Sequence, residues 1–303
     1  MCNLNTDVLS IIFEEFILNY NTLFSCLLVN KCWYETVIPT LWRNPWRNQM
    51  KKRQKRSLFE TITSFLSEDS KRFLESQGIE LVYRIPSFNY ITFCTSMINY
   101  NLYDIIQNQP LTDDYDRYIV LDEIYRLLIR KCLPLKYMDM SFMQYQFYLL
   151  PGAKHWLSDI STLCCSAVTE PYYFQGSAPL CQSIEELCIN SCHQDNYGLA
   201  KLIEVQKNLK YLEISRNEGN GIDSLDVISR RLNHHARSII KFKAVFEGIL
   251  ISPKVLPELV NLRELELSVI NLILSTKENE SEDRMILSEI LKEYAPACLN
   301  NIT

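Results

Sequence analysis

Cysteine and histidine are the residues of this sequence whose side chains could most readily bind a metal or take part in catalysis. Cys188, Cys192 and His193 could hold zinc, because thiolate and imidazole are its usual ligands. No second paired cluster completes a tetrahedral set, so we expect neither a metal site nor a bound cofactor. Positions in a repeating strand and turn account better for both cysteines.

Other groupings have the residue types of catalytic or phosphate-binding sites. Cys164-Cys165 and His155 could supply a thiol nucleophile and a base, but such catalysis also needs an environment that activates the thiol. Gly219-Asn220-Gly221 lacks the third glycine of a phosphate-binding loop, and His234-His235 falls near the end of a predicted helix. We therefore expect a protein that is not an enzyme, with a cysteine hydrolase as the enzymatic alternative.

The composition is that of a folded protein with no general attraction to nucleic acid. Of its 303 residues, 47% are hydrophobic and 22% are charged, far from the composition of a disordered chain. The net charge of −5 argues against nucleic acid as a partner, and no apolar run approaches the about 18 residues of a membrane span. Eleven cysteines with no signal segment before them predict reduced thiols in the cytoplasm or the nucleus.

The first 46 residues contain signals for three short helices. Asn5-Thr6-Asp7 can cap a first helix, whose apolar residues follow at helical spacing. Asn21-Thr22 marks the start of a second helix, and Pro39 predicts the end of the third, because proline cannot continue a helix. Domains below about 40 residues rarely bury enough apolar surface to be stable alone, so part of this surface is expected to bind another protein.

These residues resemble the F-box motif in order and spacing. The motif usually opens with Leu-Pro, and this chain has Asn5 in place of the proline, where an asparagine cap can start the helix instead. The resemblance extends to Leu41-Trp42, covers residues 1–46, and implies that this segment binds a Skp adaptor, which links it to a cullin–RING ligase. The adaptor-binding residues that it implies are Leu4, Val8, Leu9, Ile12, Phe13, Phe16, Leu23, Leu27, Val29 and Trp33. The alternative is that the helices belong to the core of a larger helical domain.

Residues 47–131 are predicted to be a basic linker and a helical connector. The basic run at residues 47–56 is interpreted as an exposed linker, with a nuclear localisation signal as the alternative. Apolar spacing predicts helices at residues 57–66, 68–77, 88–108 and 116–131. Gly78 is placed to end the second of these helices, and Asp113 and Asp114 can cap the last.

Residues 132–303 contain an internal repeat, in which an apolar residue is followed three residues later by a second and two later by a third. The six instances are Leu135/Met138/Met140, Ile160/Leu163/Cys165, Ile184/Leu187/Ile189, Leu209/Leu212/Ile214, Ile239/Phe242/Ala244 and Leu262/Leu265/Leu267. Their middle members are 25, 24, 25, 30 and 23 residues apart. The pattern predicts a short strand in each repeat, with alternate side chains pointing inward and a helix covering the outside.

This part of the chain resembles a leucine-rich-repeat array. Helices are predicted at residues 198–206, 222–232 and 282–294, between or after the strands. Cys192 and Asn217 take the turn position that the family fills with cysteine or asparagine, where the side chain satisfies buried backbone.

Together these patterns predict an α/β protein: an N-terminal three-helix F-box and helical connector, followed by a curved leucine-rich-repeat-like solenoid. The two resemblances imply a substrate-recognition subunit of a Skp–cullin–F-box E3 ubiquitin ligase, whose repeats bind the target protein. The alternative is a leucine-rich-repeat interaction scaffold with no ubiquitin role, in which the N-terminal helices only cap the repeats. Solenoid specificity depends on exposed side chains, so no motif identifies the target.

Overall fold

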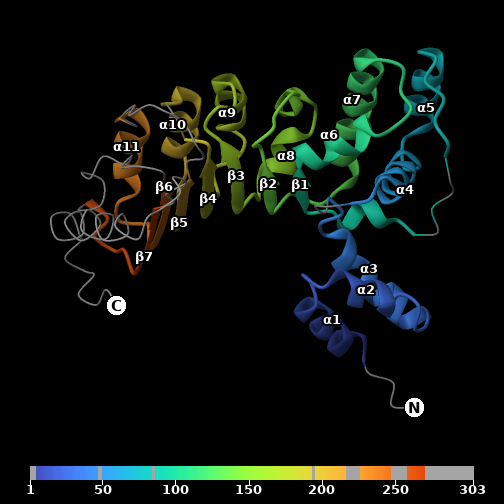
Figure 1. The fold of residues 1–303 in the computed structure, drawn as a ribbon, viewed down its shortest axis with the longest axis horizontal. Coiled ribbons are helices and arrows are strands. Elements are labelled where there is room, and N and C mark those ends of the chain that lie inside the picture. Colours follow the sequence, from blue (N-terminus) through green and yellow to red (C-terminus); the bar gives the residue numbers. More distant parts are fainter. Residues whose placement is uncertain are drawn as a thin grey trace, which may run out of the picture. The chain divides into compact units, whose positions relative to one another are not determined.

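The computed structural model has an α/β fold, in which N-terminal helices precede a seven-stranded, all-parallel sheet that alternates with helices (Figure 1). The described residues are 5–46, 50–83, 86, 88–192, 195–215, 226–246 and 258–269. The chain divides into two compact units. Unit 1 comprises Met1–Tyr137 and Leu150–Trp156, and unit 2 comprises Met138–Leu149 and Leu157–Thr303.

The first three helices of unit 1 are each capped by an asparagine. The helices are α1 (Thr6–Glu15), α2 (Tyr20–Cys26) and α3 (Lys31–Trp42). The Asn5 side chain accepts a hydrogen bond from the Asp7 N–H, as the sequence predicted. The second helix starts earlier than predicted, because its cap is Asn19, whose side chain accepts from the Thr22 N–H, rather than Asn21.

Pro39 does not end α3, which corrects the prediction from sequence. The helix runs on to Trp42, and the Arg43 N–H donates to the Pro39 carbonyl at 3.0 Å. Proline removes one backbone hydrogen bond and costs about 3 kcal/mol in a helix interior. Val37 and Leu41, on either side of the proline, are both buried. Their burial offsets the lost hydrogen bond, so tertiary packing overrides the local preference.

The three helices share a small core of their own. Its buried members are Leu9, Phe13, Leu23, Cys26, Val37 and Leu41. Trp33 packs edge-on against Phe13, with 5.5 Å between ring centres. Beyond α3, Trp42 stacks on Tyr90 at 5.0 Å, and the Trp46 indole donates to the Ser96 carbonyl at 2.6 Å. The helical core is therefore continuous with the connector of unit 1.

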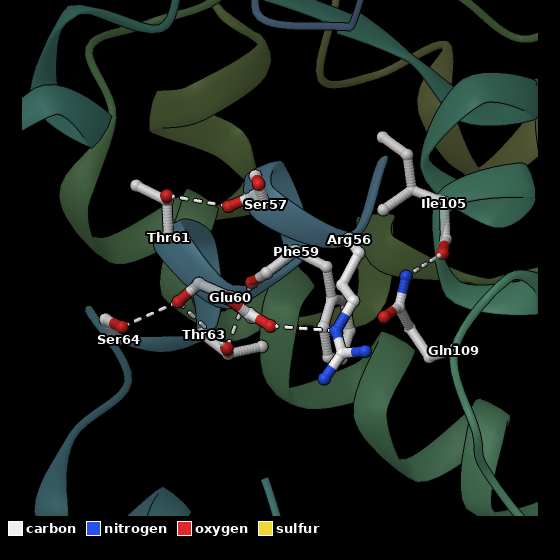
Figure 2. Close-up of polar contacts among 9 residues, drawn as sticks. All are labelled: Arg56, Ser57, Phe59, Glu60, Thr61, Thr63, Ser64, Ile105 and Gln109. Atoms are coloured by element: carbon white, nitrogen blue, oxygen red, sulfur yellow. Dashed lines mark hydrogen bonds and ion pairs between the residues drawn. The ribbon is translucent and has the colours of Figure 1, made fainter. Parts of the chain in front are cut away.

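The connector begins with α4 (Lys52–Thr63), which starts five residues before the predicted helix. Figure 2 shows that hydroxyl groups near its end donate to carbonyls four residues earlier. These hydrogen bonds are Thr61 to Ser57, Thr63 to Phe59 and Ser64 to Glu60. The buried Glu60 carboxylate accepts from Arg56 at 3.0 Å, one helical turn away, so this acidic side chain has a structural partner.

The end of α5 (Glu68–Ser76) has the geometry predicted from Gly78. That glycine has a φ of +79°, a conformation that favours glycine. The Gly78 N–H donates to the Glu75 carbonyl and the Ile79 N–H to the Leu74 carbonyl, each at 3.0 Å. These two bonds form a Schellman motif, which satisfies the last carbonyls of the helix.

The predicted helix at residues 88–108 is only half correct. The segment contains a 3₁₀ turn, η1 (Tyr90–Phe93), a strand, β1 (Ser96–Ile98), and only then α6 (Asn99–Gln107). The sheet therefore starts within the predicted connector. By contrast, α7 (Asp114–Lys131) matches its prediction, and the Asp113 side chain caps it by accepting from the Asp116 N–H at 2.8 Å.

The strands follow one another through the sheet in chain order. After β1 they are β2 (Tyr137–Asp139), β3 (Thr162–Ser166), β4 (Glu186–Asn190), β5 (Tyr211–Ser215), β6 (Lys241–Phe246) and β7 (Glu264–Val269). The middle members of five predicted repeats are direct neighbours across β3 to β7: Leu163, Leu187, Leu212, Phe242 and Leu265. The repeat pattern thus predicted both the strands and their parallel register.

Short helices connect these strands. They are α8 (Ala153–Leu157), α9 (Pro171–Ser177), α10 (Tyr197–Glu204) and α11 (Asp226–Leu232), with 3₁₀ turns η2 (Phe147–Leu149) and η3 (Asn233–His235). In unit 2, α9 to α11 line up along one side of the strands (Figure 1). The sequence predicted α10 and α11, whereas α8 and α9 were not predicted. The helix predicted at 282–294 lies outside the described residues.

Adjacent repeats are joined by a buried asparagine that the sequence pattern did not single out. The Asn196 amide donates to the carbonyls of Ala167 and Thr169 at 2.9 and 2.8 Å. Its side-chain oxygen accepts from the Leu199 N–H and so caps α10. Of the two predicted turn residues, Cys192 is buried and its N–H donates to the Ser215 carbonyl, whereas Asn217 lies outside the described residues.

Candidate functional site

The N-terminal helices expose an unusual amount of apolar side-chain surface. Their exposed apolar set, as we call it, consists of Val8, Ile11, Phe16, Leu18, Phe24, Leu28 and Val29. All seven fall within 22 residues of the chain, although the same helices already bury a core. Singly exposed apolar residues are normal on a protein surface, but a concentration of this kind indicates an interaction site.

Local geometry explains why these side chains stay outside the core. Val8 and Ile11 are one turn apart on α1, and Phe24 and Leu28 are one turn apart around the end of α2, so each pair shares a face. Leu18 lies in the link between the two helices. Leu18 and Leu28 are 88% and 87% exposed, so nearly their whole surface is accessible to a partner.

The structure divides the predicted adaptor-binding residues into three groups. Leu9, Phe13 and Leu23 are buried in the helical core, and Ile12, Leu27 and Trp33 pack partly against it. Val8, Phe16 and Val29 are exposed, and Leu4 lies outside the described residues. The buried three can therefore support a binding surface but cannot touch a partner. The exposed residues missing from the prediction are Ile11, Leu18, Phe24 and Leu28. Each is an apolar residue that does not fall at the helical spacing of the core residues, and this mismatch is the sequence signal that could have identified them.

An ion pair holds α1 against the end of α3. Both terminal nitrogens of Arg43 contact the Glu14 carboxylate, at 2.6 and 2.5 Å. This bidentate hydrogen bonding lowers the pKa of Glu14 and raises that of Arg43. The pair joins α1, the helix that carries Val8 and Ile11, to the residue at the end of α3, in addition to the core that the two helices share.

The second half of the predicted basic linker is helical. Residues 52–56 form the first turns of α4. Lys55 pairs with Asp104 on α6 at 2.6 Å, and Arg56 pairs with Glu60. Lys55 thus joins α4 to α6, whereas Arg56 pairs within α4, and Lys51, Lys52 and Arg53 are exposed.

The candidate catalytic and metal-binding residues do not assemble into a site in the described residues. Cys164 and Cys188 are opposite each other on β3 and β4, and their mutual hydrogen bond raises the pKa of Cys188. Burial raises the pKa of Cys165 well above its ordinary value. A raised pKa keeps a thiol protonated and unreactive at neutral pH. His155 belongs to a different compact unit from these cysteines.

The remaining chemical candidates have structural contacts or lie outside the described residues. His235 is buried with its Nε2 atom 2.8 Å from the Ile203 carbonyl, and burial lowers its pKa. His234 beside it is exposed. His193 and the segment 219–221 are outside the described residues.

The sheet in unit 2 has one face lined by buried side chains and one that is partly accessible. Leu163, Leu187 and Leu212 belong to the buried set. The alternate residues are half-buried or exposed, and we call them the open face. They are Thr162, Cys164, Glu186, Cys188, Asn190, Tyr211, Glu213, Ser215, Lys241, Lys243, Glu264 and Glu266.

Over the described residues, no helix has the length and apolar character to cross a bilayer. In the same residues, no cluster of three or more His, Cys, Asp or Glu side chains is placed to hold a metal ion. The nine cysteines described are all free thiols. No family model matches the chain, and no curated protein matches its sequence at a significant level.

Proposed function

We propose that this chain is the substrate-recognition subunit of a Skp–cullin–F-box E3 ubiquitin ligase, working in the cytoplasm or the nucleus. Residues 1–46 act as the F-box and bind the Skp adaptor. Residues 47–131 connect this module to residues 132–303, which bind the target protein. The chain catalyses nothing itself; it raises the effective concentration of the target beside the ligase.

The exposed apolar set on the N-terminal helices is the observation that carries this proposal. Fully burying an exposed Leu or Phe side chain contributes about 1.5–3 kcal/mol, so these residues could supply much of the affinity of a complex. They belong to the segment whose sequence resembles the F-box motif, for which a Skp adaptor is the expected partner. The buried core beneath them holds the surface in place without a partner.

The repeat units support the receptor part of the proposal. We infer that they form a curved solenoid of the leucine-rich-repeat type. The middle repeat residues are in register across β3 to β7, and the first member of each repeat, from Leu135 to Leu262, is buried. Solenoids of this type present extended surfaces to other proteins, as a target receptor requires.

Co-purification with a Skp adaptor tests the proposal directly. The intact chain should bind, and a Leu18→Asp, Leu28→Asp variant should not, because a charge at each site would be desolvated at the interface. Leu9 and Phe13 are unsuitable for this test, because both are buried and a charge there would unfold the helices.

A matched control places the same substitutions elsewhere. Leu133 and Leu149 are 54% and 69% exposed and lie outside the N-terminal helices. A Leu133→Asp, Leu149→Asp variant should bind the adaptor as the intact chain does. Failure of the folded, intact chain to bind would remove the ubiquitin role.

The alternative function is a repeat scaffold whose N-terminal helices act only as a cap. The stacking of Trp42 on Tyr90 and the hydrogen bond between the Tyr34 and Tyr90 hydroxyls, at 2.8 Å, favour it, because they join the helices to the connector. Such contacts stabilise the chain and give no reason for the exposure of Leu18 and Leu28. Adaptor binding separates the two functions.

A further inference from the structure

The open face carries an excess of negative charge across β4 to β7. Its carboxylates and ammonium groups are Glu186, Glu213, Glu264, Glu266, Lys241 and Lys243. Four carboxylates and two ammonium groups leave two negative charges in excess. Neighbouring strands are about 4.8 Å apart, so these charges lie close enough to act on one ligand.

Both lysines are already engaged by the face itself. Lys241 Nζ lies 2.8 Å from a Glu264 oxygen and 5.6 Å from the centre of the Tyr211 ring. Lys243 Nζ lies between Glu213 and Glu266, at 3.6 and 3.5 Å. An ionised carboxylate has about four acceptor positions on its two oxygens, so the four carboxylates retain capacity for further donors. The face therefore suits an incoming cation better than an anion.

The last segment of the chain has the wrong charge to occupy this face. Residues 270–303 contain six acidic and three basic side chains. Like charges repel across a shared surface, so the excess of acid in this segment disfavours its binding there. A separate protein with the opposite charge is the better match.

We propose that the open face of β4 to β7 binds a cationic segment of the target protein, an extended stretch with at least two lysine or arginine side chains. The incoming ammonium or guanidinium groups pair with Glu186 and Glu213, towards the middle of the sheet, and offset the two excess charges. The identification of the ligand as a ligase target rests on the proposed function; the charge selectivity of the face does not.

A synthetic peptide of alternating lysine and serine, carrying a fluorophore, tests the face on the full chain by fluorescence anisotropy. A peptide of alternating glutamine and serine is the neutral control. A Glu186→Gln, Glu213→Gln variant should bind the lysine peptide about tenfold more weakly. A Glu68→Gln, Asp69→Asn variant, with the same charge change on α5, should bind it within about twofold of the unchanged chain. A Lys243→Gln variant should bind it more tightly, a gain that structural damage cannot produce.

The results separate this proposal from the adaptor proposal. Equal binding by the open-face and α5 charge variants, weaker binding by Lys243→Gln, or no preference for the lysine peptide over the neutral one would each overturn it. Adaptor co-purification is measured on the same preparations. Charge-selective peptide binding without adaptor binding would leave the open face as a binding site and remove the ligase role. Adaptor binding without charge-selective peptide binding would keep the ligase role and remove the proposed site on the open face.

Discussion

Replacing Leu18 and Leu28 with alanine is expected to weaken adaptor binding while leaving the chain folded. Both side chains are almost fully exposed, so an interface that covers them gains nearly their whole transfer free energy. At about 1.5–3 kcal/mol for each side chain, losing both costs about 3–6 kcal/mol. Because each 1.4 kcal/mol is about a tenfold change, the dissociation constant should rise roughly 10² to 10⁴-fold.

The same two substitutions should hardly change folding stability. Surface substitutions away from special features usually change the free energy of unfolding by less than about 0.5 kcal/mol. Titration calorimetry with the Skp adaptor and urea unfolding of the chain alone measure the two quantities separately. An unchanged dissociation constant would refute the assignment of these leucines to the interface.

Phe13→Ala, unlike the two leucine substitutions, is expected to destabilise the fold. Its side chain is 1% exposed and contacts the Trp33 ring, so truncation should destabilise the helical core by about 3–5 kcal/mol. Adaptor binding should then fall together with the urea midpoint. Binding lost at an unchanged midpoint would show that Phe13 contacts the partner, contrary to its burial.

Three further outcomes follow from single contacts. Glu14→Gln should lower stability at about pH 7 and have a progressively smaller effect as the pH falls through the acidic range, because the Arg43 hydrogen bond lowers the pKa of Glu14 and its contribution is lost as the pH falls through that lowered value. Gly198→Ala should lower the melting temperature, since a Cβ would lie 2.0 Å from the Pro171 carbonyl oxygen, and overpacking costs about 1–3 kcal/mol. Acidification below about pH 6.5 should destabilise unit 2 through His235, because burial lowers its pKa and protonation therefore favours the unfolded state.

Each of these outcomes has a direct check. Urea unfolding of Glu14→Gln across the acidic range would contradict the ion-pair argument if the loss of stability stayed constant. If Gly198→Ala had the same melting temperature as the unchanged chain, α9 and α10 would be able to move apart without a loss of folding free energy. His235→Gln should reduce the pH dependence of stability just below about pH 6.5, and an unaltered dependence would assign it to another group.

The helices and strands that the sequence predicted best are those with a local cause. Asn5 and Asp113 cap their helices because a short polar side chain accepts from the free backbone donors of the first turn. Gly78 ends α5 because its positive φ suits glycine. The repeat pattern predicted β3 to β7 and their register, because each buried position in one strand needs an apolar neighbour in the next.

The errors arose where packing overrides local preference. Pro39 lies inside α3 because the residues around it are buried, and burial is a property of the assembled helices. The strand Ser96–Ile98 was assigned to a helix because three residues are too few to show a period. The five-residue helix α8 is also too short to show a helical period.

For the candidate site, too, some features could be predicted from the sequence and others depend on tertiary packing. Residue type and spacing in the sequence predicted three helices in the first 46 residues and the repeated strands after residue 132. Periodicity alone could not separate Leu9 and Phe13, which form the core, from Leu18 and Leu28, which remain exposed, because all four are large and apolar. Only the packing of α1, α2 and α3 decides which of them face one another and which remain available to a partner. Likewise, the sequence determines that Glu213 and Lys243 are charged, but their pairing across β5 and β6 exists only when the strands lie side by side.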